Sequence, residues 1–238
     1  MIKYDLLVDG SRLSVVPASD ERSARAYALG AFPQGESGVL LFPDGDADFG
    51  ALSIDKFNNE PKEPYLPLAA LSYFFGTLRG YPRMELEIKY NGKVHELPIG
   101  QNEYSFSVNV GKCKNICAKN LNFEDGIDIL GYTTGTGKRA FIIPCADSEL
   151  FFGDRLGALL DRYEYAAAVS VSAGGSITLR SAPASLSYTL VSDSISVLLS
   201  TGISIPDGQL ALTLNGIPLR VCRCDTALRF YPMIKYIS

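Results

Sequence analysis

The sequence has no cluster of Lys and Arg residues and no long apolar run. Its 238 residues carry a formal net charge of −4, and the acidic and basic residues are interspersed. A nucleic-acid-binding surface needs grouped basic residues that follow the phosphates, so nucleic acid is not an expected partner. A membrane-spanning helix needs about 18 or more consecutive apolar residues, which this chain lacks. The sequence therefore predicts a protein that contacts neither nucleic acid nor membrane.

The first residues also lack the pattern of a secretory signal. Asp5 and Asp9 interrupt the N-terminal apolar stretch too early for a signal peptide. A cytoplasmic protein is the expectation that follows.

Histidine is nearly absent, and the cysteines do not have metal-binding spacing. His95 is the single histidine, and the five cysteines stand at positions 113, 117, 145, 222 and 224. An odd number of cysteines without a secretory signal argues against a disulfide framework. The CxxxC and CxC spacings differ from the CxxC of structural zinc sites. We expect no metal and no cofactor.

The remaining composition is that of an ordinary globular protein, with 47% apolar and 20% charged residues. Alternating or continuous apolar runs, bounded by Gly, Asn or Pro, predict strands along most of the chain. Tyr90-Asn91-Gly92-Lys93 predicts a tight hairpin, because Asn-Gly accepts the positive φ of a type I′ turn. The predicted strands are 3–8, 12–16, 38–42, 84–90, 93–99, 104–110, 141–144, 166–172, 177–180, 209–214 and 217–224.

Three helices are predicted between these strands. Asp20–Leu29 has Asp20 as an N-cap. Leu66–Leu78 and Ser185–Thr201 are apolar, and the first of these is apolar nearly all round, which indicates a buried helix. Each half of the chain thus has strands, a buried helix and an Asn-Gly hairpin in the same order. This order predicts an α+β fold of two pseudo-symmetric halves, 1–115 and 116–238, each a mostly antiparallel sheet curled around one helix.

Short segments distributed along the chain are similar to one known family. Phe57-Asn58 precedes the apolar helix as in the family's FNxDGSE loop, and Gly10–Val16 and Glu36–Leu41 are similar to two of its strand segments. In order and spacing, these segments resemble diaminopimelate epimerase and the related proline racemases and phenazine-biosynthesis isomerases. The resemblance implies two similar halves with the site between them, and a role in amino acid metabolism.

The resemblance also implies two catalytic cysteines, which this sequence lacks. The family's cysteine positions correspond here to Pro67 and Ser192. Proline transfers no proton, and a serine without a base is a poor acid–base group at neutral pH. We therefore expect a pseudoenzyme, an epimerase-like protein that is inactive as a two-thiol racemase and has a reshaped cleft between its halves.

Two alternatives stay open. Glu63 and Asp193 are candidates to replace the thiols as acid and base in an isomerase or lyase; as helix N-terminal acids, they also suit a capping role. The other alternative is a non-catalytic binding or assembly module, with a homodimer as one form.

The candidate ligand-binding residues are polar side chains in the matching segments. They suit a small amino acid or hydroxy acid, whereas a turn asparagine and helix-capping serines are the simpler structural roles. The candidates are Asn58, Ser11, Ser192 and Ser194.

Overall fold

The computed structural model describes residues 2–31, 37–54, 63–99, 104–110, 117–122, 128–133, 139–144, 160, 162, 167–172, 174–181 and 187–237. The chain divides into two compact units, one formed by Met1–Ser105 with Pro232–Ser238 and the other by Phe106–Tyr231. This division differs from the boundary expected after residue 115. Strand β7 (Phe106–Asn109) pairs with β15 (Ala227–Phe230) and so belongs to the second unit, while the last residues return to the first.

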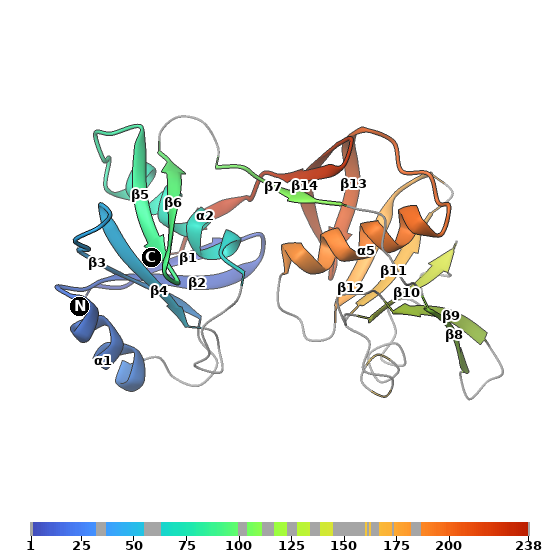
Figure 1. Ribbon diagram of the computed structural model, residues 1–238, viewed down its shortest axis with the longest axis horizontal. Helices are drawn as coiled ribbons and strands as arrows, with labels where there is room; N and C mark the ends of the chain where they lie inside the picture. The colour runs from blue at the N-terminus through green and yellow to red at the C-terminus, as the bar shows by residue number, and fades with distance from the viewer. Residues whose placement is uncertain are drawn as a thin grey trace. The chain divides into compact units, whose positions relative to one another are not determined.

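The first unit is one seven-stranded sheet in the order β16-β1-β2-β3-β4-β5-β6 (Figure 1). The β2–β3 and β4–β5 pairs are parallel, and the other neighbours are antiparallel. The strands are β1 (Tyr4–Val8), β2 (Ser11–Pro17), β3 (Gly38–Phe42), β4 (Phe49–Ile54), β5 (Glu85–Tyr90), β6 (Lys93–Pro98) and β16 (Ile234–Tyr236).

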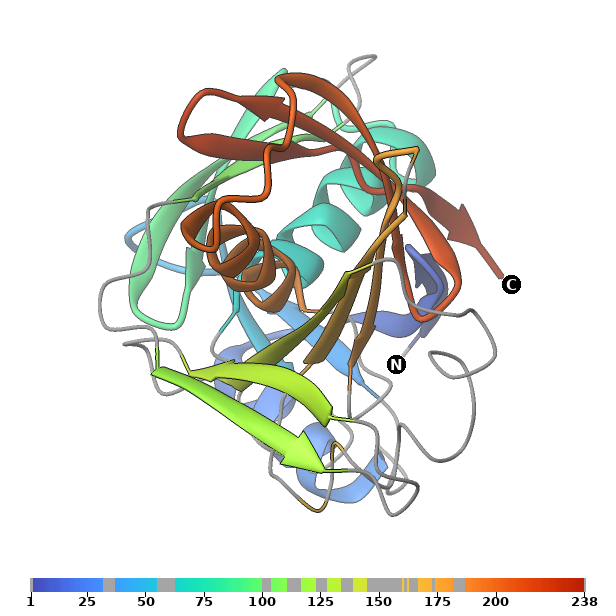
Figure 2. The ribbon, with the colours of Figure 1, turned by 90° about the vertical axis from the view of Figure 1, so that its right-hand side faces the viewer.

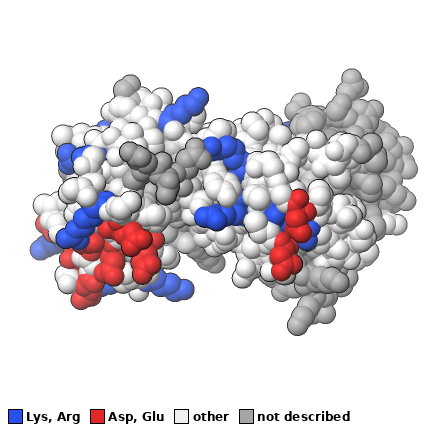
Figure 3. All heavy atoms as spheres, turned by 90° about the horizontal axis from the view of Figure 1, so that it is seen from above, with Lys and Arg blue, Asp and Glu red and all other residues white. Residues whose placement is uncertain are grey.

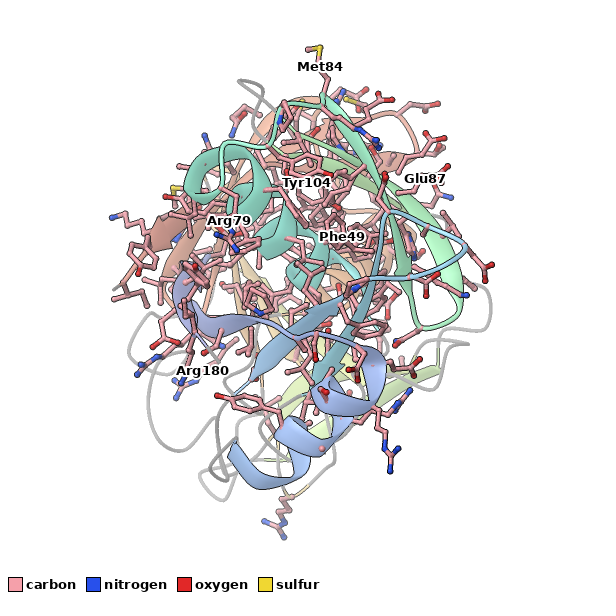
Figure 4. All side chains as sticks on the ribbon, turned by 90° about the vertical axis from the view of Figure 1, so that its left-hand side faces the viewer. Phe49, Arg79, Met84, Glu87, Tyr104 and Arg180 are labelled. Carbon is pink, nitrogen blue, oxygen red and sulfur yellow. The ribbon has the colours of Figure 1, made fainter. Side chains whose placement is uncertain are left out.

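Helix α2 (Tyr65–Tyr73) lies in the core of this unit and continues as a π-helical turn, η1 (Phe74–Leu78). Its residues are apolar around the whole circumference, which suits a helix that the sheet surrounds. Phe74 packs edge-on against Tyr4 and Phe75, with ring centroids 5.0 and 5.3 Å apart. Figure 4 shows Phe49 and Tyr104 beside this helix, while Met84 points outward.

The opposite face of the sheet is covered by α1 (Glu21–Ala31). Asp20 caps this helix, as predicted, by accepting a 2.7 Å hydrogen bond from the backbone N–H of Ser23. Ala24 and Ala28 are buried in a second, smaller apolar cluster between the helix and the sheet. The small alanine side chains let the helix lie close to the strands.

The C-terminal strand closes the free edge of β1. Backbone N–H of Asp9 donates to the carbonyl of Met233 at 2.9 Å, and backbone N–H of Met233 donates to the Asp9 carboxylate at 2.8 Å. Asp9 is 5% exposed and has φ of 44°, a left-handed conformation that Asp tolerates better than most residues. This two-point clamp joins segments separated by 224 residues.

The second unit is a nine-stranded sheet in the order β7-β15-β14-β13-β12-β11-β10-β9-β8. Figures 1 and 2 show α5 (Tyr188–Ser200) along the concave side of this sheet. The remaining strands are β8 (Cys117–Asn122), β9 (Asp128–Thr133), β10 (Arg139–Pro144), β11 (Ala167–Val171), β12 (Ile177–Ser181), β13 (Gly208–Leu214) and β14 (Ile217–Cys224).

The two units share one topology. The core helix of each unit connects two parallel strands, β4 to β5 in the first unit and β12 to β13 in the second. Each of these strands has an antiparallel neighbour on its other side. Each sheet also contains a second parallel pair, β2–β3 in the first unit and β10–β11 in the second. The predicted α+β fold of two pseudo-symmetric halves, each a mostly antiparallel sheet curled around a buried helix, is therefore confirmed.

Candidate functional site

The start of α2 holds the first position that the sequence resemblance matches to a family cysteine. Pro67 is the third residue of this helix and is buried. Pro64, at the N-cap, provides no side-chain hydrogen bond, and its carbonyl accepts the backbone N–H of Leu68 at 3.0 Å. Two prolines in this turn remove two backbone N–H donors from a helix end where such groups would otherwise be available to an anion.

Next to these prolines lie an acid and two phenols. Glu63 precedes the N-cap residue Pro64 and is partly exposed. Burial, and then the charge of Glu63, raises the pKa of the half-buried Tyr65. Burial, and then Tyr65, raises the pKa of Tyr104. Both phenols therefore keep their protons at neutral pH and act as hydrogen-bonding groups, not as bases.

Helix α5 in the second unit holds the other cysteine-like position. Ser192 is 2% exposed, and its hydroxyl donates a 2.9 Å hydrogen bond to the carbonyl of Asn109. Ser194 is fully buried, and its hydroxyl donates to the carbonyl of Leu190 at 2.8 Å. Each hydroxyl hydrogen is thus used by a backbone carbonyl of the same unit. This arrangement suits side chains that satisfy polar groups inside the core.

Asp193 lies between these two serines and is only partly exposed, with one carboxylate oxygen buried. One oxygen of this carboxylate is thus shielded from solvent, unlike the oxygens of a fully solvated helix acid. The N-cap of the helix is Ser187, whose hydroxyl accepts the backbone N–H of Leu190 at 3.2 Å. Asp193 therefore does not supply the N-cap.

The structure shows less about the remaining predicted ligand residues, Ser11 and Asn58. Ser11 begins β2 directly after the Asp9-Gly10 turn and is partly exposed. Asn58 lies outside the described residues. Ser11 and Glu63 belong to the first unit, and Ser192, Asp193 and Ser194 to the second.

A separate pocket of about 370 Å³ lies on the first unit, between α1, the β3–β4 strands and the β5–β6 hairpin. Ion pairs within this unit occupy its charged groups: Lys89 Nζ lies 2.6 Å from an Asp46 oxygen and 3.6 Å from an Asp44 oxygen, and Arg25 Nε lies 2.9 Å from a Glu21 oxygen. Figure 3 shows acidic side chains grouped on part of the first unit with basic ones beside them. No sequence pattern indicates this pocket, because its walls come from three separate segments.

Comparison with solved structures identifies the class to which this fold belongs. The similar structures include phenazine-biosynthesis PhzF proteins and a hydroxyproline epimerase, so the chain has the fold of the diaminopimelate epimerase-like superfamily. The predicted resemblance is confirmed at the level of the fold. No family model and no curated protein sequence matches the chain.

The individual similarities span nearly the whole chain at low identity. A PhzF-family protein of Enterococcus faecalis is 10% identical with a TM-score of 0.64, covering 100% of this chain and 98% of its own. A hydroxyproline epimerase of Agrobacterium vitis, with bound trans-4-OH-L-proline, is 12% identical with a TM-score of 0.57, covering 99% and 91%. A methylitaconate-Δ-isomerase is 9% identical with a TM-score of 0.51, covering 99% and 94%. Identities this low establish the shared fold alone.

Within the described ranges, no helix has the length and apolar character needed to cross a membrane. The same part of the chain brings no three His, Cys, Asp or Glu side chains together as a metal site.

Proposed function

We propose that this protein retains the fold of the isomerase superfamily but does not catalyse two-thiol racemisation. One observation carries the proposal: the helix positions that resemble the catalytic cysteines hold Pro67 and Ser192. Pro67 has no ionisable group, and the hydroxyl hydrogen of Ser192 is donated to the carbonyl of Asn109. Neither side chain suits the removal or delivery of a proton at a substrate carbon.

The decisive measurement is exchange of the α-proton in D2O. Diaminopimelate, proline, trans-4-hydroxy-L-proline and glutamate are incubated with the protein, and deuterium incorporation is followed by NMR. We expect no exchange above the uncatalysed rate, because loss of one acid–base group already removes a factor of about 100 to 10,000 in rate. Exchange that a thiol alkylator abolishes would contradict the proposal, since it would require a catalytic cysteine elsewhere in the chain.

A second candidate function is isomerisation through carboxyl groups, with Glu63 and Asp193 as acid and base. The buried carboxylate oxygen of Asp193, next to the cysteine-like position 192, supports this candidate. The ligand class would be a small amino acid or hydroxy acid, in line with the trans-4-OH-L-proline bound to the Agrobacterium vitis epimerase.

The same exchange assay separates the two candidates. Carboxyl-based catalysis predicts exchange that resists thiol alkylation and is lost in both Glu63→Gln and Asp193→Asn. Glu21→Gln is the matched control, because Glu21 is a first-turn helix acid outside these positions. Exchange that persists in both site variants would exclude the carboxyl mechanism.

A further inference from the structure

Strand β14 carries two thiols on one face. Side chains alternate along a strand, so Cys222 and Cys224 share a face while Leu219 and Val221, which are buried, point to the other. The two sulfur atoms lie 3.9 Å apart, and both cysteines are free thiols. Cys224 is exposed and Cys222 partly exposed. The second unit therefore presents an accessible dithiol on the face of its sheet that is opposite to the core.

The strand holds the thiols too far apart for an easy disulfide. Residues i and i+2 of a strand are separated by about 6.7 Å between Cα atoms, at the upper limit of the range that disulfides tolerate. The sulfurs would have to approach from 3.9 Å to about 2.05 Å. Cys222 is in register with Gln209 on β13 and with Arg229 on β15, so the backbone is paired on both sides and resists the necessary bend.

The same separation fits a bridging metal ion. With Zn–S bonds of about 2.3 Å, sulfurs 3.9 Å apart subtend an angle of about 116° at the metal, close to the tetrahedral value. Thiolates are also the ligands that select zinc and other soft cations. We propose that Cys222 and Cys224 together bind one Zn²⁺ ion as a two-thiolate chelate on β14, with water in the remaining coordination positions. This site is independent of the proposed function.

Binding requires both thiols to lose their protons, so each Zn²⁺ that binds releases two protons to solvent. Burial, followed by the contact with Cys224, raises the pKa of Cys222. The charge of Asp207, just before β13, acts in the same direction, whereas Arg229 on the neighbouring strand opposes it. A cysteine thiol is mostly protonated at neutral pH when no metal is bound. Zinc affinity should rise with pH in this range, because the metal competes with protons.

The test measures zinc bound by the reduced, metal-free full-length chain in competition with a chromophoric chelator. Cys222→Ser, Cys224→Ser and the double variant are compared with Cys145→Ser, which removes a thiol at a distant sequence position. We expect the unmodified chain and Cys145→Ser to bind one more zinc equivalent than the double variant. Each single variant at the site should lose at least the roughly tenfold in affinity that the loss of an outer-shell partner already costs. Equal zinc binding by the unmodified chain and the double variant would overturn the proposal.

A second measurement needs no variant and so does not depend on folding of the mutants. Alkylation of the unmodified chain is followed by peptide mass spectrometry with and without Zn²⁺. We expect zinc to slow modification of Cys222 and Cys224. Unchanged alkylation of both, at zinc concentrations that saturate the competition assay, would contradict the site. A 222–224 disulfide that forms in the folded chain under mild oxidation would also contradict it, because the geometric argument requires that the strand keep the sulfurs apart.

Discussion

The two core helices occupy equivalent places in one topology, yet they are built from different side chains. Helix α2 is short and begins without a side-chain cap, and its continuation η1 packs through aromatic rings, of which Phe74 and Phe75 are nearly fully buried. Helix α5 has 13 residues, a serine N-cap and three buried serines, Ser192, Ser194 and Ser196. The topology thus sets where a core helix lies but leaves open whether aromatic packing or hydrogen-bonded serines fill the space around it.

The largest expected effect comes from removing an aromatic ring from the core of the first unit. Phe74→Ala should lower the free energy of unfolding by about 3–5 kcal/mol, because it leaves a cavity against Tyr4 and Phe75. Denaturant unfolding gives the magnitude, and hydrogen exchange should show lost protection in α2 with α5 unchanged. Met84→Ala is the control: its side chain is 78% exposed, and we expect a change within about 0.5 kcal/mol. An equal loss of protection in α5 would show that the two units unfold together.

A smaller effect is expected in the sheet around α2. A methyl group on Gly50 would approach within 2.3 Å of the Phe42 ring, which lies over the glycine from the neighbouring strand. Phe42 is 5% exposed and has little room to move, so Gly50→Ala should destabilise by about 1–3 kcal/mol. Adding Phe42→Leu should recover part of this loss in thermal unfolding. No recovery in the double variant would mean that the strain has another source.

The two core helices also differ in their N-cap residues, and this difference can be tested. Ser187→Ala removes the bond that Leu190 N–H donates, and it should reduce the free energy of unfolding by about 1 kcal/mol. Ser187→Thr keeps a capping oxygen and should stay close to the unmodified protein. Pro64, the N-cap residue of α2, has no such bond to lose, so Pro64→Ala should not show this capping loss. Hydrogen exchange at the first turn of each helix measures the difference.

The smallest expected effect is a pH dependence confined to the first unit. Burial opposes ionisation of Asp5, but hydrogen bonds from Ser14 and Arg12 outweigh it, and the pKa of Asp5 is lowered. A carboxyl with a lowered folded-state pKa stabilises the fold above its unfolded pKa of about 3.9, and this contribution is lost as the pH falls through the folded value. Ser14→Ala should therefore lower the free energy of unfolding at pH 7. At pH 2 the variant and the unmodified protein should differ less in this free energy. An unchanged pH profile would argue against this role of Asp5.

Local patterns allowed much of the fold to be predicted from the sequence. Strands 38–42 and 217–224 have the predicted bounds, and Asn91 and Asn215 have the positive φ that their Asn-Gly turns require. The last turn of the helix predicted over 66–78 is π-helical, a feature that apolar periodicity does not reveal. Strand β16 was missed because it exists through pairing with residues more than 200 positions earlier.

The candidate site was less accessible to prediction, because its chemistry depends on long-range contacts. The sequence placed Ser192 at a cysteine-like position, but its hydrogen bond spans 83 residues to Asn109. Tyr104 lay in a predicted strand with no motif around it, and its proximity to Tyr65 arises only in the folded unit. The assignments of Asn58, Ser11, Ser194, Glu63 and Asp193 as ligand or catalytic residues stay predictions.

The return of the chain to β1 also determines when the edge of β1 becomes paired during synthesis. A ribosome makes β1 before the second unit and β16 after it. Throughout that interval the outer edge of β1 has unpaired N–H and C=O groups, which are a template for wrong pairing between nascent chains. The second unit can pair its own strands as soon as Tyr231 emerges, whereas β1 gains its outer neighbour only after Ile234–Tyr236 have followed.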